Sequence, residues 1–148
     1  MAVNPFSDLH ARAFSHETED IGKVRLAIMN VLATSDLKET SSEGIHGHVI
    51  WVLEGTLNDA HAIDLFFCRL SREDLEEIAR TLTKRIDDGC NLFLRLDKQD
   101  AFRGVVRLAD RDDVISVRVR VRSYPARCTL AADLAKQYLT GLLSASGE

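Results

Sequence analysis

Valine and arginine alternate near the end of the sequence, and this pattern constrains the fold more than any other segment does. The alternating residues are Val117, Arg118, Val119, Arg120, Val121 and Arg122. Because successive side chains of a strand point to opposite faces, the segment predicts a half-buried β-strand, with the valines in a core and the arginines in solvent. Such a strand needs a second layer of structure to cover its valines.

Four further segments predict strands on similar grounds, at residues 6–14, 46–57, 90–97 and 102–109. The second has apolar residues on both faces, which is typical of a strand inside a sheet. In the third, leucines alternate with Phe93 and Arg95, so these two side chains are expected on the solvent face. The fourth follows a turn at residues 98–100, and its pattern puts Arg103 and Arg107 on the same solvent face.

Helices are predicted between the strands, over residues 18–32, 58–70, 71–89 and 131–142. The third begins with a capping box at Ser71, in which a hydroxyl and a carboxylate satisfy unpaired backbone amides. Gly89 is expected to end that helix in a left-handed turn. The polar residues 35–44 are expected to form a loop.

These elements predict a single α+β domain over residues 1–148, with a frayed tail at residues 143–148. Their order is β-α-β-α-α-β-β-β-α, which implies a two-layer sandwich: a mostly antiparallel sheet with helices packed on one face. A length of 148 residues and a hydrophobic share of 45% are enough for one core without disulfide bonds.

The net charge of −4 hides a basic segment. Residues 95–127 hold four more basic than acidic residues, while the rest of the chain holds eight more acidic than basic residues. Neighbouring strands lie about 4.8 Å apart, so arginines on one sheet face would form a patch. Guanidinium groups bind phosphate oxygens in a bidentate fork and stack on exposed bases. We therefore interpret this face as an RNA-binding surface. Its candidate residues, with two polar residues of the adjoining turn, are Arg95, Lys98, Gln99, Arg103, Arg107, Arg118, Arg120 and Arg122.

Two other interpretations stay open. Rows of arginine also occur on ordinary solvated faces, where Asp97 or Asp100 would pair with them. Alternatively, Phe93 and Val105 supply an apolar centre within a charged rim, which is the usual anatomy of a protein interface. The chain would then be an interaction module that forms a homodimer or docks on a larger assembly.

Catalysis, metals and cofactors are not expected. The sequence has no G-x-S-x-G, no G-x-x-x-x-G-K and no H-E-x-x-H motif. His46 and His48 share one face of a predicted strand but lack a nearby third ligand. The three cysteines, Cys68, Cys90 and Cys128, have no positioned base and are expected to be buried packing residues.

The chain is expected to be cytoplasmic. No run of about 18 apolar residues could cross a membrane, and the first residues lack the basic start and apolar stretch of a secretory signal. Three unclustered cysteines also suit a reducing compartment.

Several segments together resemble a known family. The most specific are NLFLRLDKQ at residues 91–99 and the basic strand with Tyr-Pro at residues 114–125, and weaker matches lie at residues 13–20 and 44–48. Over residues 9–139 the chain resembles small archaeal proteins described as predicted RNA-binding, exosome-associated proteins. The resemblance implies an α+β fold similar to a large-subunit ribosomal protein that contacts the smallest ribosomal RNA. It also implies a non-catalytic RNA-binding role, with a link to RNA processing or degradation. The contact positions it implies are Arg95, Lys98, Gln99, Arg118, Arg120 and Arg122.

Overall fold

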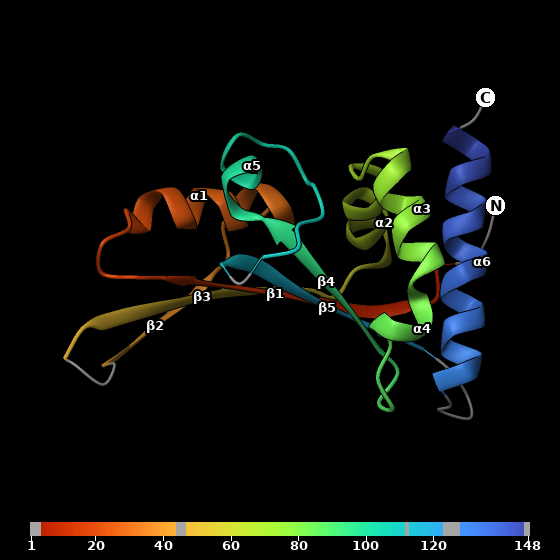
Figure 1. The fold of residues 1–148 in the computed structure, drawn as a ribbon, viewed down its shortest axis with the longest axis horizontal. Coiled ribbons are helices and arrows are strands. Elements are labelled where there is room, and N and C mark those ends of the chain that lie inside the picture. The colour runs from red at the N-terminus through yellow and green to blue at the C-terminus, as the bar shows by residue number, and fades with distance from the viewer. Residues whose placement is uncertain (1–3, 44–46, 112, 123–127, 147–148) are drawn as a thin grey trace. The chain divides into compact units, whose positions relative to one another are not determined.

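The computed structural model describes residues 4–43, 47–111, 113–122 and 128–146 (Figure 1). Five strands form one open antiparallel sheet in the order β2-β3-β1-β5-β4. The strands are β1 (Phe6–Ser15), β2 (Lys38–Glu43), β3 (Val49–Leu57), β4 (Asn91–Asp97) and β5 (Val114–Val121). The helices are α1 (Ile21–Leu32), α2 (Ala60–Cys68), α3 (Arg72–Arg80), α4 (Leu82–Arg85), α5 (Lys98–Phe102) and α6 (Cys128–Ser146). The predicted α+β class and its two-layer arrangement are confirmed.

The chain divides into two compact units, each assembled from separate segments. Unit 1 comprises Met1–Leu9, Leu57–Leu94 and Arg118–Glu148, and unit 2 comprises His10–Thr56 and Arg95–Val117. In unit 1, α2, α3, α4 and α6 cover one face of the strand segments (Figure 1). In unit 2, α1 and α5 do the same. The single domain stays a prediction.

An aromatic cluster forms the core of unit 1. The rings of Phe6 and Phe67 stack with centroids 4.9 Å apart, and the Tyr138 ring meets Phe6 edge-on at 5.1 Å. The Tyr138 hydroxyl donates to Asp64 Oδ1 at 2.5 Å, and Asn4 Nδ2 donates to the same oxygen at 2.9 Å. Burial raises the pKa of Tyr138 well above its ordinary value, and the bond to Asp64 adds to this effect. The cluster therefore ties the C-terminal helix to the first strand and to α2.

In unit 2, α1 lies directly on β3 and α5. A Cβ atom at Gly55 would lie 2.6 Å from Leu32 Cδ1 and 2.9 Å from Leu37 Cδ2, so a larger residue there would force these leucine side chains to move. Asn30 Nδ2 donates to the carbonyl oxygens of Ala101 and Phe102 at 2.9 and 3.3 Å, which holds α5 against α1.

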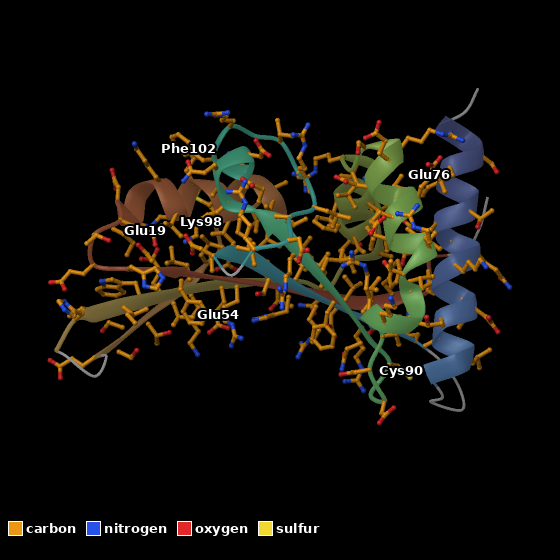
Figure 2. All side chains as sticks on the ribbon, viewed as in Figure 1. Glu19, Glu54, Glu76, Cys90, Lys98 and Phe102 are labelled. Atoms are coloured by element: carbon orange, nitrogen blue, oxygen red, sulfur yellow. The ribbon has the colours of Figure 1, made fainter. Side chains whose placement is uncertain are left out.

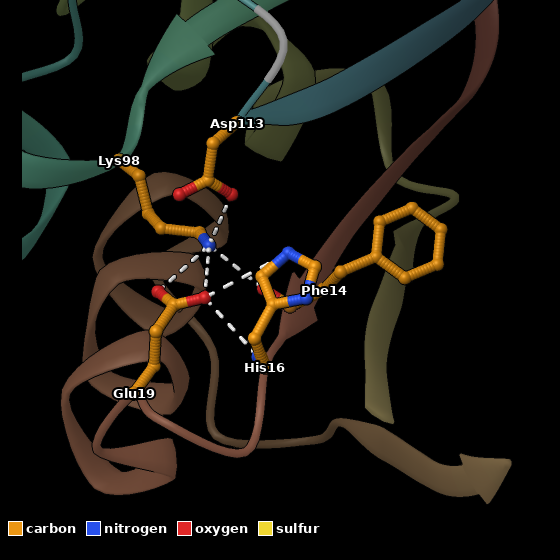
Figure 3. A network of polar contacts seen from close by, with 5 residues as sticks. All are labelled: Phe14, His16, Glu19, Lys98 and Asp113. Carbon is orange, nitrogen blue, oxygen red and sulfur yellow. Dashed lines mark hydrogen bonds and ion pairs between the residues drawn. The ribbon is translucent and has the colours of Figure 1, made fainter. Parts of the chain in front are cut away.

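A buried ammonium group organises the rest of unit 2 (Figure 3). Lys98 is 6% exposed, and its Nζ donates to the Phe14 carbonyl oxygen and to Asp113 Oδ1, both at 2.7 Å. It also donates to Glu19 Oε2 at 3.1 Å. The three acceptors come from the end of β1, the loop before α1 and the residue before β5, so the Lys98 side chain joins the β1–α1 connection to a segment about 95 residues later in the sequence.

The predicted turn at residues 98–100 and the strand at residues 102–109 are both wrong. The Asp97 side chain accepts from the Asp100 amide and caps the short helix α5, which ends before Gly104 at a φ of +85°. What remains of the expected pairing is one bridge between Leu96 and Leu108. The polar residues after Asp97 are equally compatible with a hairpin turn and with a helix, and the capping bond from the Asp97 side chain favours the helix.

The predicted loop at residues 35–44 is also wrong, because residues 38–43 form β2. This edge strand pairs antiparallel with β3, with Lys38 opposite Glu54 and Glu43 opposite Val49. Its side chains are almost all exposed, so no apolar alternation marks it in the sequence. The element order is therefore β-α-β-β-α-α-α-β-α-β-α.

The predicted helix over residues 71–89 begins as expected but breaks early. Ser71 accepts from the Asp74 amide, which confirms the cap. Thr81 then interrupts the helix between α3 and α4, and its hydroxyl donates to the Glu77 carbonyl oxygen at 2.7 Å. The left-handed residue lies at Cys90, with a φ of +64°, and not at Gly89.

We predict that Lys98→Met lowers the free energy of unfolding by about 2 kcal/mol. The substitution leaves three acceptors without their shared donor, and the loss is below the full value for a buried pair because Asp113 is exposed. Urea denaturation measures the change. Lys38→Met, at an exposed lysine of the same unit, serves as the control and should stay within about 0.5 kcal/mol. Equal effects of the two substitutions would contradict this role.

We predict that Tyr138→Phe costs about 1.5 kcal/mol, because it removes a hydrogen bond to a carboxylate. The raised pKa of Tyr138 means that the folded state holds its proton more tightly than the unfolded state. That contribution is complete below about pH 10 and is lost as the pH rises further. Unfolding followed from pH 8 to 11 should therefore show a steeper alkaline decline for the parent protein than for Tyr138→Phe. Parallel declines would contradict the assignment.

Candidate nucleic-acid interface

Three arginines form a row along the end of β5 in unit 1. This arginine row consists of Arg118 and Arg120 within the strand and Arg122 directly after it. The valines between and beside these arginines are buried, whereas the arginines themselves are exposed. The pleat of the strand therefore puts the valines toward the helices and the guanidinium groups on the opposite face. This confirms the alternation predicted from the sequence.

The three guanidinium groups are only lightly neutralised. Arg118 Nη2 lies 3.8 Å from Asp8 Oδ1, with the Arg118 side chain 46% exposed. Arg122 Nη2 donates to the Phe6 carbonyl oxygen at 3.2 Å. Arg120 makes no ion pair with any residue of the described ranges. The expected masking partners Asp97 and Asp100 lie instead near Arg111 and Arg107, so the row keeps its donors for an external anion.

Strand β4 carries the same pattern. Its leucines are buried, while Phe93 in unit 1 is 45% exposed and Arg95 in unit 2 is also exposed. Arg95 forms no ion pair within the part of the chain that the structure describes. Val105, which the sequence groups with Phe93, is exposed in unit 2.

The remaining predicted contacts are placed differently from expectation. Arg103 follows the end of α5 and Arg107 lies in the segment beyond it, so no strand places them on the solvent face of the sheet. All three donor hydrogens of the Lys98 ammonium are needed for its buried partners, which removes Lys98 from the interface. Gln99 is exposed on α5.

Arg12 and Phe14 of unit 2 are two further candidates that sequence reasoning missed. They alternate along β1 with buried Ala11 and Ala13, and the Arg12 guanidinium carbon lies 5.5 Å from the centroid of the Phe14 ring. Phe14 is 41% exposed. The period-two pattern at residues 10–14 was the signal that could have identified both.

These two residues lie on the face of β1 that points away from α1 and α5. His10, on the same face by the alternation of the strand, contacts Glu54 at 2.9 Å. Figure 2 shows Glu54 on the side of the strands opposite Lys98 and Phe102. His10 also contacts Thr56 Oγ1 at 3.0 Å through its Nδ1 atom, so it links β1 to β3 on this face.

One group of side chains in unit 2 has ligand atoms close enough together for a metal ion, but the Lys98 ammonium already supplies a positive charge there. His16, Glu19 and Asp113 bring their ligand atoms close together, but the Lys98 ammonium lies against both carboxylates (Figure 3). Of the histidine pair considered in the sequence analysis, His46 lies outside the described residues. His48 Nδ1 contacts Glu17 at 2.5 Å.

Of the cysteines, Cys90 is buried as expected, whereas Cys68 is exposed, which corrects its predicted role as a buried packing residue. The Cys128 side chain lies outside the described part, as does Tyr-Pro at residues 124–125. Among the helices that are described, none combines the length and apolar character that a membrane crossing requires.

The chain is similar to archaeal proteins along most of its length. RNA-binding protein PAB1135 of Pyrococcus abyssi is 26% identical over 144 residues, which cover 90% of this chain and 94% of that protein. The solved structure of Mth689, a DUF54 protein from Methanothermobacter thermautotrophicus, is 33% identical with a TM-score of 0.76, covering 90% of this chain and 98% of that one. Protein AF2318 from Archaeoglobus fulgidus is 29% identical with a TM-score of 0.74, covering 89% and 98%.

The exosome association and the ribosomal-protein-like fold implied by the sequence resemblance stay predictions. A family model described as RNA binding matches residues 8–121, a range that includes most of β1 and all of β4 and β5, with the exposed arginines at positions 12, 95, 118 and 120. Since this match spans well over half of the sequence, the chain belongs to the RNA-binding family.

Proposed function

We propose that the chain is a non-catalytic RNA-binding protein that contacts the RNA backbone with exposed arginines of its strands. The observation that carries this proposal is the arginine row on β5, whose guanidinium groups share one face and have few internal partners. Guanidinium groups match phosphate oxygens in geometry and charge. The protein's membership of an RNA-binding family supports the same conclusion.

Exposed aromatic rings favour single-stranded RNA as the ligand. Phe14 and Phe93 each present a ring on a strand that also carries an exposed arginine. Unpaired bases stack on aromatic side chains and on guanidinium planes, whereas paired bases cannot. Arg12 beside Phe14 offers both kinds of surface in unit 2.

The proposed role is to hold RNA and not to cleave it. The interface that we propose consists of arginines and phenylalanines, which bind RNA but do not transfer protons at neutral pH. We extend the proposal to an accessory role in RNA processing or degradation, on the resemblance of the sequence to exosome-associated proteins. In that role the protein would hold an RNA strand and present it to a partner enzyme.

We predict that Arg118→Ala/Arg120→Ala/Arg122→Ala lowers the affinity for single-stranded RNA roughly tenfold or more, because three phosphate contacts are lost. The matched control is Arg80→Ala/Lys84→Ala/Lys136→Ala, which removes the same charge from exposed helix positions of unit 1. Fluorescence anisotropy with a labelled oligonucleotide measures both. The double variant Arg118→Ala/Arg120→Ala keeps the hydrogen bond from Arg122 to the Phe6 carbonyl oxygen. A loss of affinity in this variant therefore cannot be attributed to misfolding after that bond is removed. Equal losses in the two triple variants would refute a specific surface.

We also predict a steep dependence on salt. Three neutralised phosphates on a single strand give a slope of about −2 in log affinity against log salt, so the affinity falls roughly tenfold between 50 and 150 mM. In the arginine-row triple variant the slope should become shallower by about 2, because its three phosphate contacts are lost. Salt-insensitive binding by the parent protein would count against backbone recognition.

A further inference from the structure

A cavity of about 380 Å³ opens between α1 and α5 in unit 2. It lies on the helical side of the strands, where Figure 2 shows Phe102, Lys98 and Glu19. None of the arginines discussed above lines it. The side chains that decide its chemistry are Glu19, Asp20, Lys23, Val24, Gln99 and Phe102.

The apolar part of the cavity suits a flat ring. Val24 is buried, and Phe102 is half-buried with its ring at the cavity wall. Lys23 Nζ lies 5.7 Å from the Phe102 ring centroid, near the outer limit of about 6 Å for a cation over a ring. The ammonium thus lies over the ring face, and a planar ligand that stacks there moves this flexible side chain aside and keeps Lys23 close by.

The polar part offers groups that read a base edge. The Gln99 side chain, exposed at the rim, has no hydrogen-bond partner among the described residues. Asp20 Oδ1 accepts from the Gly22 amide at 2.9 Å, and no hydrogen bond reaches its other oxygen within the described ranges. A carboxylate is an acceptor only, so Asp20 selects for a ligand that donates. An amide both donates and accepts.

The charge balance argues against a multiply charged anion or a metal ion. Lys98 neutralises Glu19 from within, which leaves Asp20 and Lys23 as the cavity's remaining charges. Lys23 can meet one phosphate at the rim, while Asp20 repels further ones. A single nucleotide unit, with a flat donor-bearing base and one phosphate, fits this pattern.

We propose that this cavity binds one unpaired RNA base that carries an exocyclic amino group, namely adenine, cytosine or guanine. The base stacks on Phe102, its amino group donates to Asp20, Gln99 bonds the remaining edge, and Lys23 meets the attached phosphate. Uracil binds more weakly, because its one edge donor, N3–H, lies between two carbonyl oxygens that repel the Asp20 carboxylate. This inference rests on the proposed function, since the base arrives as part of a bound strand.

The first test titrates the isotope-labelled protein with AMP, CMP, GMP, UMP and ribose 5-phosphate and follows amide shifts by NMR. We expect saturating shifts at Val24, Gln99 and Phe102 with the three amino-bearing nucleotides, at least threefold weaker binding of UMP, and no such shifts with ribose 5-phosphate. Shifts of equal affinity with ribose 5-phosphate, or no shifts at these residues with any nucleotide, would overturn the proposal.

The second test separates this site from the arginine row. Gln99→Ala and Phe102→Leu should weaken oligoadenylate binding at least threefold and oligouridylate binding by a smaller factor, whereas the arginine-row triple variant should weaken both equally. Gln137→Ala, at an exposed glutamine of α6, is the matched control and should change neither. If the arginine variant alone has an effect, the base site is refuted and the proposed function stands. If the parent protein binds no RNA, both fall.

Discussion

The pleat of β5 places side chains two residues apart on the same face, and the proposed interface depends on this constraint. Burial of the valines fixes the register, because a shift by one residue would put the guanidinium groups into the core of unit 1. The cost of burying a charge without a partner thus holds the arginines in solvent. A surface built in this way is specified by the core beneath it.

In unit 2, the buried Lys98 ammonium fixes the positions of neighbouring segments through hydrogen bonds and ion pairs. It joins the Phe14 carbonyl oxygen, Glu19 and Asp113, so the end of β1, the loop before α1 and the residue before β5 are held around one cation. The same residue borders the cavity beside α1 and α5, where it offsets the charge of Glu19. A lysine that resembles a surface contact in the sequence therefore supports a neighbouring site from inside.

Prediction from the sequence succeeded where burial leaves a periodic trace. The valine–arginine strand, the leucine strand before α5 and the capping box at Ser71 all appear where expected. It failed where burial is slight or a single side chain decides. Strand β2 is exposed along its length, and the Asp97 cap turns the following residues into a helix. For the interface, the exposure of Arg95, Arg118, Arg120 and Arg122 was predictable, but the displacement of Arg103 and Arg107 was not.

By itself the sequence determined the α+β class, the alternation of β4 and β5, and the basic character of the C-terminal strands. These features follow from the local spacing of apolar residues and from the charges of the side chains, both of which can be read directly from the sequence. Only the tertiary structure decided that Lys98 is buried, that Arg12 lies beside an exposed Phe14, and that α1 and α5 enclose a cavity. Each of these depends on segments brought together by packing, and the partners of a side chain across such contacts leave no trace in its local sequence.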